Sequence, residues 1–388
     1  MVTLLLVIIY MSFISLGLPD SLLGSAWPSM RADLVMPVSY AGILSFIITS
    51  GTIISSFLSE KVIRRFGTGI VTAVSVTMTA VALLGFSIAP GFFWLCIPAI
   101  PLGLGAGSVD VALNNFVALH YKARHMSWLH CFWGVGATAG PIIMSYFLVR
   151  EGGWKMGYNT IGLIQLCLVV ILFISLPLWK KAGAGQESLE GTPKSRKFID
   201  LIRIPGAKPA ILTFFSYCAL EAAAGLWGSS YLVISRGISA NTAAKWISLY
   251  YFGITLGRFL SGFVTIKLGN RALVRLGQGI IIAGLLCILL PVGNNYILMM
   301  GFLLVGLGCA PIFPCAVHET PERFGKDLSQ AFIGIQMAFA YMGSTIMPPI
   351  LGFIAQKTTF AVYPYFLLIF LIVMFLSNEK TNRSAYNS

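Results

Sequence analysis

Three acidic residues lie inside long apolar stretches of the chain: Asp20, Asp110 and Glu221. An ionised side chain at the centre of a bilayer costs at least ~2.5–3.5 kcal/mol, so it normally faces a cavity and binds a solute or an ion. The other ten of the 13 acids fall in predicted loops or tails. The chemistry indicated is therefore ion and solute handling inside a membrane, although a hydrogen bond that only joins two helices is the alternative for each acid.

Asp20 and Glu221 are related by their position in the chain. They lie 201 residues apart, and each is followed four residues later by a glycine, Gly24 or Gly225. Asp20 also follows Pro19, which removes a backbone donor and can open a helix. We expect both carboxylates to bind solute.

Asp110 has no acidic counterpart in the second half, where the equivalent position is near Phe313. Asp110 and Asn114 share one helical face, and Asn115 adjoins them. An acid that breaks the symmetry is a candidate for proton coupling, with Asn114 and Asn115 as solute contacts. The alternative is a hydrogen bond that fixes helix packing.

Four kinds of side chain extend this set. His130 can titrate near physiological pH and is a second proton-coupling candidate, or a structural histidine near a helix end. Trp133 and Trp227 can stack on the apolar face of a sugar, or else fill the core or anchor the interface. Gln336 is a neutral hydrogen-bonding candidate. Arg258 is expected near a helix end, where it can extend to the interface in a gating or structural role.

The elements that hold these residues are predicted to be membrane-spanning helices. Of the 388 residues, 57% are hydrophobic and 10% are charged, against about 25% charged in soluble domains, which excludes an ordinary cytosolic enzyme and a disordered chain. A spanning helix needs about 20 mostly apolar residues, and continuous runs without alternation exclude a β-barrel. The predicted spans are twelve: 3–27, 38–59, 69–89, 92–119, 128–149, 157–179, 210–235, 243–266, 272–291, 296–318, 330–354 and 360–377.

Charge placement gives the orientation. Nineteen basic residues lie on the side of the 180–209 linker and six on the other, with Arg258 inside a span. Positive residues favour the cytoplasmic side, so the linker and both termini are predicted to be cytoplasmic. The net charge of +13 then reflects topology and not a nucleic-acid partner. The first span is expected to be a retained helix, and the seven cysteines, all in apolar runs, are expected to be small core residues without disulfides.

The two halves of the chain repeat each other. The tripeptide at 57–59 recurs at 259–261, and the one at 103–105 recurs at 306–308, at shifts of 202 and 203. Two pseudo-symmetric six-helix bundles are typical of transporters that bind solute at the bilayer midplane; a duplicated membrane protein without a transport role is the alternative. The predicted domains are a first bundle (1–179), a linker (180–209), a second bundle (210–377) and a tail (378–388).

Two loops carry the first family resemblance. The loop after the eighth span (Gly262, Lys267, Gly269, Arg271) resembles the G-x-x-x-D-R-x-G-R-R motif of the major facilitator superfamily, and the loop after the second span keeps Arg65 and Gly67. The resemblance covers nearly the whole chain and implies an all-α fold of twelve transmembrane helices. It also implies gating or structural roles for the motif positions: Arg65, Gly67, Lys267 and Gly269.

Three further stretches resemble the fucose permease branch, the fucose–galactose–hexose proton symporters. They are the stretch around Asp20, Asp110-x-x-x-Asn114, and His130-x-x-Trp133-Gly134. The resemblance implies that Asp20 binds sugar and that Asp110 is protonated, at a position where the family commonly has Glu.

The predicted function is a proton-coupled sugar symporter that works by alternating access. We expect a monomer in a bacterial plasma membrane, with a small polar solute and the lipid bilayer as partners, and no nucleic acid, metal or cofactor. The alternatives are coupling to sodium, a drug or lipid exporter of the same fold, and a channel. A polytopic enzyme is disfavoured because the sequence has no HExxH, GxSxG, CxxC or Walker motif.

Overall fold

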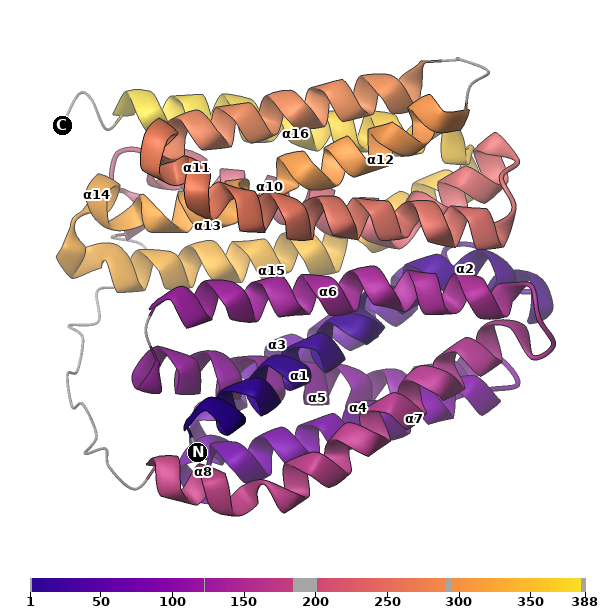
Figure 1. Ribbon diagram of the computed structural model, residues 1–388. Coiled ribbons are helices and arrows are strands. Elements are labelled where there is room, and N and C mark those ends of the chain that lie inside the picture. The colour runs from indigo at the N-terminus through magenta and orange to yellow at the C-terminus, as the bar shows by residue number, and fades with distance from the viewer. Residues whose placement is uncertain (1, 122, 184–200, 291–294, 385–388) are drawn as a thin grey trace. The chain divides into compact units, whose positions relative to one another are not determined.

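The regular secondary structure is helical in the residues that the computed structural model describes, which are 2–121, 123–183, 201–290 and 295–384 (Figure 1). The first half contains α1 (Val2–Asp20), α2 (Leu22–Asp33), α3 (Tyr40–Phe66), α4 (Thr68–Ile88), α5 (Phe92–His120), α6 (Ala123–Leu148), α7 (Gly153–Ile174) and α8 (Leu176–Gly183). The second half contains α10 (Ala207–Arg236), α11 (Ala240–Leu289), α12 (Asn295–Cys309), α13 (Ile312–His318), α14 (Thr320–Phe324), α15 (Lys326–Lys357), η1 (Phe360–Val362) and α16 (Tyr363–Ser384).

The helices suit a lipid environment. Large apolar side chains such as Phe57, Ile88 and Phe93 are more than two-thirds exposed, which is favourable only where hydrocarbon covers them. Within the described residues, eleven helical stretches are long and apolar enough to cross a membrane. The predicted span 243–266 is helical but is not among the eleven, since Lys245 and Arg258 make it more polar. A count of twelve spans therefore remains a prediction.

Two glycines, one in each half of the chain, interrupt a helix with the same backbone conformation. Gly67 separates α3 from α4 with φ 81° and ψ 154°, and Gly269 kinks α11 with φ 70° and ψ 161°. These positive φ values favour glycine, which has no Cβ to clash with the backbone. The positions are 202 residues apart, which is the spacing of the sequence repeat.

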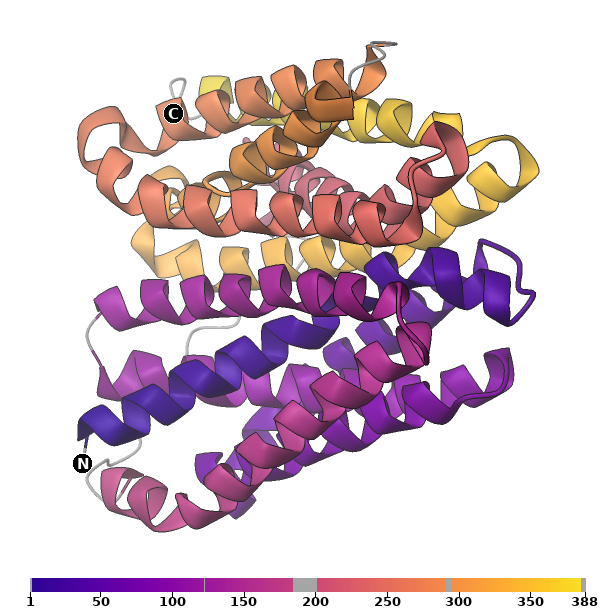
Figure 2. The same cartoon turned by 45° about the vertical axis from the view of Figure 1, so that its right-hand side comes forward.

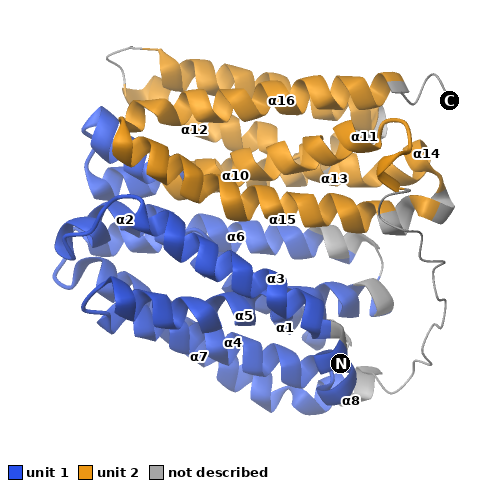
Figure 3. Ribbon diagram, turned by 180° about the vertical axis from the view of Figure 1, so that it is seen from behind, with its two compact units in different colours: residues 1–187, 228–248 blue, residues 188–227, 249–388 orange. Residues whose placement is uncertain are grey.

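The chain divides into two compact units, which are described separately (Figure 3). Unit 1 comprises residues 1–187 and 228–248, and unit 2 comprises residues 188–227 and 249–388. Most of the predicted linker and the last four residues of the predicted tail lie outside the described residues.

Close glycine contacts set the helix packing inside each unit. In unit 1, α3 and α4 pack on α5, α4 packs on α7, and α1 packs on α6 (Figure 2). A methyl group at Gly103 of α5 would overlap the Ile48 carbonyl of α3, and in unit 2 one at Gly306 of α12 would overlap the Tyr250 carbonyl of α11. Each glycine lets two backbones approach closely, so the repeat seen in the sequence recurs in the packing.

None of the seven cysteines, all of which are among the described residues, forms a disulfide, but not all of them lie in the core. Cys309 and Cys315 are buried, whereas Cys167 on α7 is exposed. The prediction of a core position is wrong for Cys167, because an apolar run does not reveal which of its faces points outward.

Candidate functional site

A carboxylate and an indole meet where α1 ends. Asp20 is the last residue of α1, and Trp133 of α6 donates its Nε1–H to Asp20 Oδ2 at 2.7 Å. Asp20 is exposed and Trp133 is half-buried, so both can reach a solute. α1 continues through Pro19, and the single turn residue Ser21 separates it from α2, which starts at Leu22.

Small residues bring these two side chains together. A methyl group at Gly17 of α1 would overlap the Trp133 carbonyl, and one at Gly136 of α6 would overlap the Ile14 carbonyl. Any larger residue at either position would push α1 away from α6. The glycines therefore set the distance at which Trp133 reaches Asp20.

Asp110 belongs to the same unit and is held by a neutral group. The Asn114 side chain donates from Nδ2 to Asp110 Oδ1 at 2.9 Å and to the Asp110 backbone carbonyl at 3.0 Å. Asp110 is half-buried, and its charge lies close enough to repel that of Asp20. The predicted pair Asp110–Asn114 is thus present, and it lies near the first carboxylate. Asn115 is exposed on α5.

His130 is exposed on α6, and its ring meets Phe13 edge-on with 6.0 Å between centroids. This contact with an apolar ring gives no support to a role in proton transfer. The proton-coupling role of His130 remains a prediction.

In unit 2 the carboxylate of Glu221 meets a cation. Arg258 Nη2 of α11 lies 3.4 Å from Glu221 Oε1 of α10, and the two side chains are 19% and 23% exposed. The Tyr250 hydroxyl donates to the Glu221 backbone carbonyl at 3.0 Å. Sequence reasoning named both charged residues and did not pair them, because they are 37 residues apart on different helices.

Two predicted solute contacts lie in the core of unit 2. Trp227 is fully buried and donates its indole N–H to the Pro348 carbonyl at 2.8 Å. Gln336 is 2% exposed, and its Oε1 accepts from the Thr320 hydroxyl at 3.0 Å. Neither side chain is presented to a solute in this structure, so we leave both out of the proposed site. An aromatic or amide in an apolar helix looks the same in sequence whether it lines a cavity or packs in the core.

The residues of the two loop motifs lie at or near the helix interruptions described above. Gly67 and Gly269 form them, and Arg65 is exposed at the end of α3, with its guanidinium 5.4 Å from the Phe66 ring centroid. The side chain of Lys267 lies outside the described residues. These observations fit a structural role for the two glycines.

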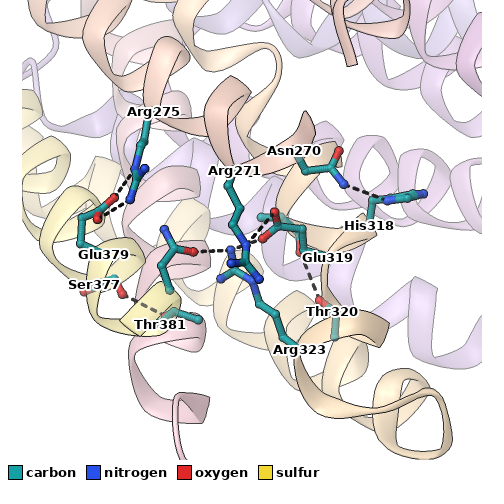
Figure 4. Close-up of polar contacts among 12 residues, drawn as sticks. Asn270, Arg271, Arg275, His318, Glu319, Thr320, Arg323, Ser377, Glu379 and Thr381 are labelled. Carbon is teal, nitrogen blue, oxygen red and sulfur yellow. Dashed lines mark hydrogen bonds and ion pairs between the residues drawn. The ribbon is translucent and has the colours of Figure 1, made fainter. Parts of the chain in front are cut away.

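A buried charge cluster in unit 2 was missed by the sequence analysis (Figure 4). Glu319 lies between α13 and α14, is 3% exposed and pairs with Arg323 and with Arg271, the latter at 3.6 Å. Arg323 also donates to Asn382 Oδ1 of α16 at 2.6 Å. Glu319 does lie in a turn between two helices, as expected, but it is buried and paired, which the sequence analysis did not anticipate. The i, i+4 spacing of Glu319 and Arg323 was the signal that could have revealed the pair.

A second, more exposed ion pair lies beside this cluster. Arg275 of α11 donates two hydrogen bonds of 2.7 Å each to the carboxylate oxygens of Glu379 on α16 (Figure 4). Together with the Arg323–Asn382 bond, this pair ties the last turns of α16 to α11 and α14.

These features define a multi-pass membrane transporter: long apolar helices, an internal repeat and carboxylates held within the helices. The chain belongs to the Major Facilitator Superfamily, whose family model matches residues 9–244 and 209–387. Membership in this superfamily of transporters separates the chain from the enzymes.

Several characterised proteins are similar over most of their length. The "Bypass of stop codon protein 6" of Saccharomyces cerevisiae is 24% identical, over 95% of this chain and 80% of its own. The glucose/mannose transporter GlcP of Bacillus subtilis is 21% identical, over 90% and 88%. The cis,cis-muconate transport protein of Acinetobacter baylyi is 22% identical, over 86% and 83%.

The fold has a counterpart among solved structures. The crystal structure of the nucleoside transporter NupG aligns with a TM-score of 0.76 over 97% of this chain and 98% of that one, at 11% sequence identity. At this identity the likeness concerns the fold alone.

Proposed function

We propose that this protein is a proton-coupled symporter for a hexose or a closely related polar solute, working by alternating access. The observation that carries the proposal is the hydrogen bond between Trp133 and Asp20. It holds an exposed carboxylate beside a half-exposed indole at the end of α1.

This pair suits a sugar. A carboxylate accepts hydrogen bonds from neighbouring hydroxyl groups, and an indole ring packs against the C–H face of a pyranose. With one oxygen fixed by Trp133, Asp20 keeps its other oxygen for solute. Both groups recognise a polyhydroxylated ring better than an apolar drug or a lipid, which disfavours the exporter alternative.

Asp110 is the proposed proton site. Its side-chain partner in the structure is the neutral amide of Asn114, which does not compensate a negative charge. A bound proton removes the cost of holding that charge inside a membrane segment and the repulsion toward Asp20. Protonation and sugar binding then favour the same state, which is the requirement for symport.

The setting of this activity is proposed from the sequence. We propose twelve spans with both termini cytoplasmic, a monomer in a bacterial plasma membrane, and a place in the fucose permease-like branch. Relatives named for glucose/mannose and for cis,cis-muconate transport support a small polar solute in general.

Proteoliposomes test the proposal. The purified chain should accumulate a radiolabelled hexose when an inward proton gradient is imposed, and a sodium gradient of equal size should have no effect. Asp110→Asn should abolish accumulation and keep exchange of internal for external sugar, because exchange needs no net proton movement.

Asp33→Asn is the matched control. Asp33 at the end of α2 also accepts an indole N–H, from Trp154 at 2.8 Å, and is exposed. Its loss should leave accumulation unchanged. Full proton-driven accumulation by Asp110→Asn would overturn the coupling role, and accumulation driven only by sodium would replace the proton.

A further inference from the structure

The side chain of Asn114 uses both of its N–H groups on a single residue. Its Nδ2 donates to Asp110 Oδ1 at 2.9 Å and to the Asp110 backbone carbonyl at 3.0 Å. A side-chain amide has two N–H donors on its nitrogen and an acceptor oxygen. Asn114 therefore has no N–H left to donate to a solute, and its effect on the site passes through Asp110.

The backbone carbonyl of Asp110 fixes the direction in which this amide points. A carbonyl oxygen only accepts hydrogen bonds, so Nδ2 of Asn114 faces it whether or not the Asp110 side chain carries a proton. The second N–H then meets Asp110 Oδ1 in both states. A proton on Oδ1 would point at that N–H, so the proton belongs on Oδ2, which has no hydrogen-bond partner among the described residues.

Two features of its surroundings favour a protonated Asp110. It lies in a membrane-spanning stretch, where an ionised side chain is costly, and the charge of Asp20 repels it. The hydrogen bond from Asn114 acts in the opposite direction, because an N–H donor stabilises a carboxylate more than a neutral acid. Without this bond, an acid at this position would hold its proton too tightly to release it.

The helices around Asp110 bring few other titratable groups. α5 packs against α3 and α4 and also contacts α1 and α6. α4 has no titratable side chain, and α3 has none between residues 41 and 59. Asp20, at the end of α1, is the group whose charge acts on Asp110. Away from the helix ends, the others are Tyr10 of α1 and His130 and Cys131 of α6.

We propose that Asn114 is the positioning residue for proton release: it directs the proton to Oδ2 of Asp110 and stabilises the carboxylate that remains. This inference rests on the proposed function and assigns its release step to a second residue. In that step the Oδ2–H bond breaks and the proton passes to water on the cytoplasmic side. The electron pair stays on the carboxylate, whose Oδ1 accepts from Asn114 throughout.

The pH profile of uptake tests this role. Radiolabelled glucose uptake into proteoliposomes should be measured under a fixed inward proton gradient while the internal pH is varied. Asn114→Ala should shift the profile upward by about one pH unit, the size expected for loss of one hydrogen bond to a charged group. At an internal pH of about 7 its accumulation should fall about ten-fold. Exchange of internal for external glucose should stay within about two-fold, because exchange needs no net proton release.

Two further substitutions at the same position give an order of effects. Asn114→Gln keeps an amide four residues from Asp110, where such pairs form hydrogen bonds on a helix, and should restore the profile to within about half a unit. Asn114→Asp replaces the donor by a second carboxylate and should shift the profile further upward than Asn114→Ala does.

Gln165→Leu is the control for loss of an amide inside unit 1. The Gln165 side chain donates to the Ser15 carbonyl at 2.6 Å and accepts from the Thr79 hydroxyl at 2.9 Å, so it joins α7 to α1 and α4 without touching a carboxylate. This variant should lower the thermal unfolding temperature and leave the pH profile in place. A purely structural role of Asn114 would give the same result as this control.

Infrared difference spectroscopy detects the proton without transport. The full chain in detergent should show a carboxylic acid C=O band that is absent from Asp110→Asn. The pH midpoint of this band should rise in Asn114→Ala by the same amount as the uptake profile, and thermal unfolding reports whether each variant is folded.

Two outcomes would overturn the inference. They are an unchanged profile and infrared midpoint in folded Asn114→Ala, and an equal loss of uptake and exchange at every pH. A wild-type chain that takes up no glucose under a proton gradient refutes the proposed function instead. In that case a shifted infrared midpoint in Asn114→Ala still supports the action of Asn114 on the Asp110 proton.

Discussion

The two units hold their acidic side chains by different means. In unit 1, Asp20 and Asp110 accept hydrogen bonds from an indole and an amide, which are neutral. In unit 2, Glu221 and Glu319 face guanidinium groups. Acids with neutral partners keep their negative charge available for protons and hydroxyl groups, whereas acids paired with arginine are compensated. The two units therefore differ in how the charge of their acids is compensated.

The largest effect expected from this contrast concerns stability. Glu319→Gln should lower the free energy of unfolding by about 3 kcal/mol, because it leaves the buried Arg323 cation without its partner. Thermal unfolding in detergent measures the change. Glu322→Gln, three residues away and exposed, is the control and should have almost no effect. An equally large loss of stability in Asp110→Asn would contradict the difference between the two units, because that substitution leaves no buried cation without a partner.

A double-mutant cycle compares two further ion pairs of unit 2, Glu221–Arg258 and Glu379–Arg275. Glu221 and Arg258 should show a coupling energy of about 2 kcal/mol in unfolding measurements on Glu221→Gln, Arg258→Gln and the double variant. Glu379 and Arg275 should show less than about 1 kcal/mol, because the Arg275 side chain is 55% exposed and water screens the pair. A larger coupling energy for Glu379 and Arg275 would mean that short hydrogen bonds contribute more to the stability of an ion pair than its burial does.

Trp133→Phe tests the neutral partner in unit 1. Loss of the indole N–H and part of the ring face should weaken hexose binding about ten-fold, which corresponds to ~1.4 kcal/mol. Trp154→Phe removes the equivalent hydrogen bond to Asp33 and should leave hexose affinity unchanged. Equal affinities in the two variants, measured by equilibrium binding, would remove Trp133 from the site.

The smallest effect should be the same in both halves. Gly67→Ala and Gly269→Ala should each lower the free energy of unfolding by about 1 kcal/mol, because alanine is strained at positive φ. A Cβ would have no atom within 4 Å at either glycine, so strain is the only cost. A difference of more than ~1 kcal/mol between the two thermal unfolding results would show that the repeat is not conserved in the two loops.

The sequence predicts local relationships well. Asp110 and Asn114 lie four residues apart on one helix, and their hydrogen bond follows from that spacing. The sequence repeat predicts that Gly103 and Gly306 are equivalent. In the structure each of these glycines packs against a carbonyl of a neighbouring helix.

Contacts between side chains on different helices are harder to predict from the sequence. The pairing of Glu221 with Arg258 depends on how α10 lies against α11, which no spacing reveals. Trp227 and Gln336 were expected to contact solute but lie in the core, since burial depends on which face of a helix is covered. Glu319 lies in a short polar segment typical of a loop, and only the surrounding arginines explain its burial.

The attachment of α16 has a practical consequence for producing the protein. Ser377, Asn378, Thr381 and Asn382 are buried although α16 ends in polar residues, and Arg323 and Arg275 bind this end. An expression variant shortened to the apolar part of α16 would lose the acceptors of both arginines. Affinity tags are therefore best appended beyond Ser384, with the preceding turns kept whole.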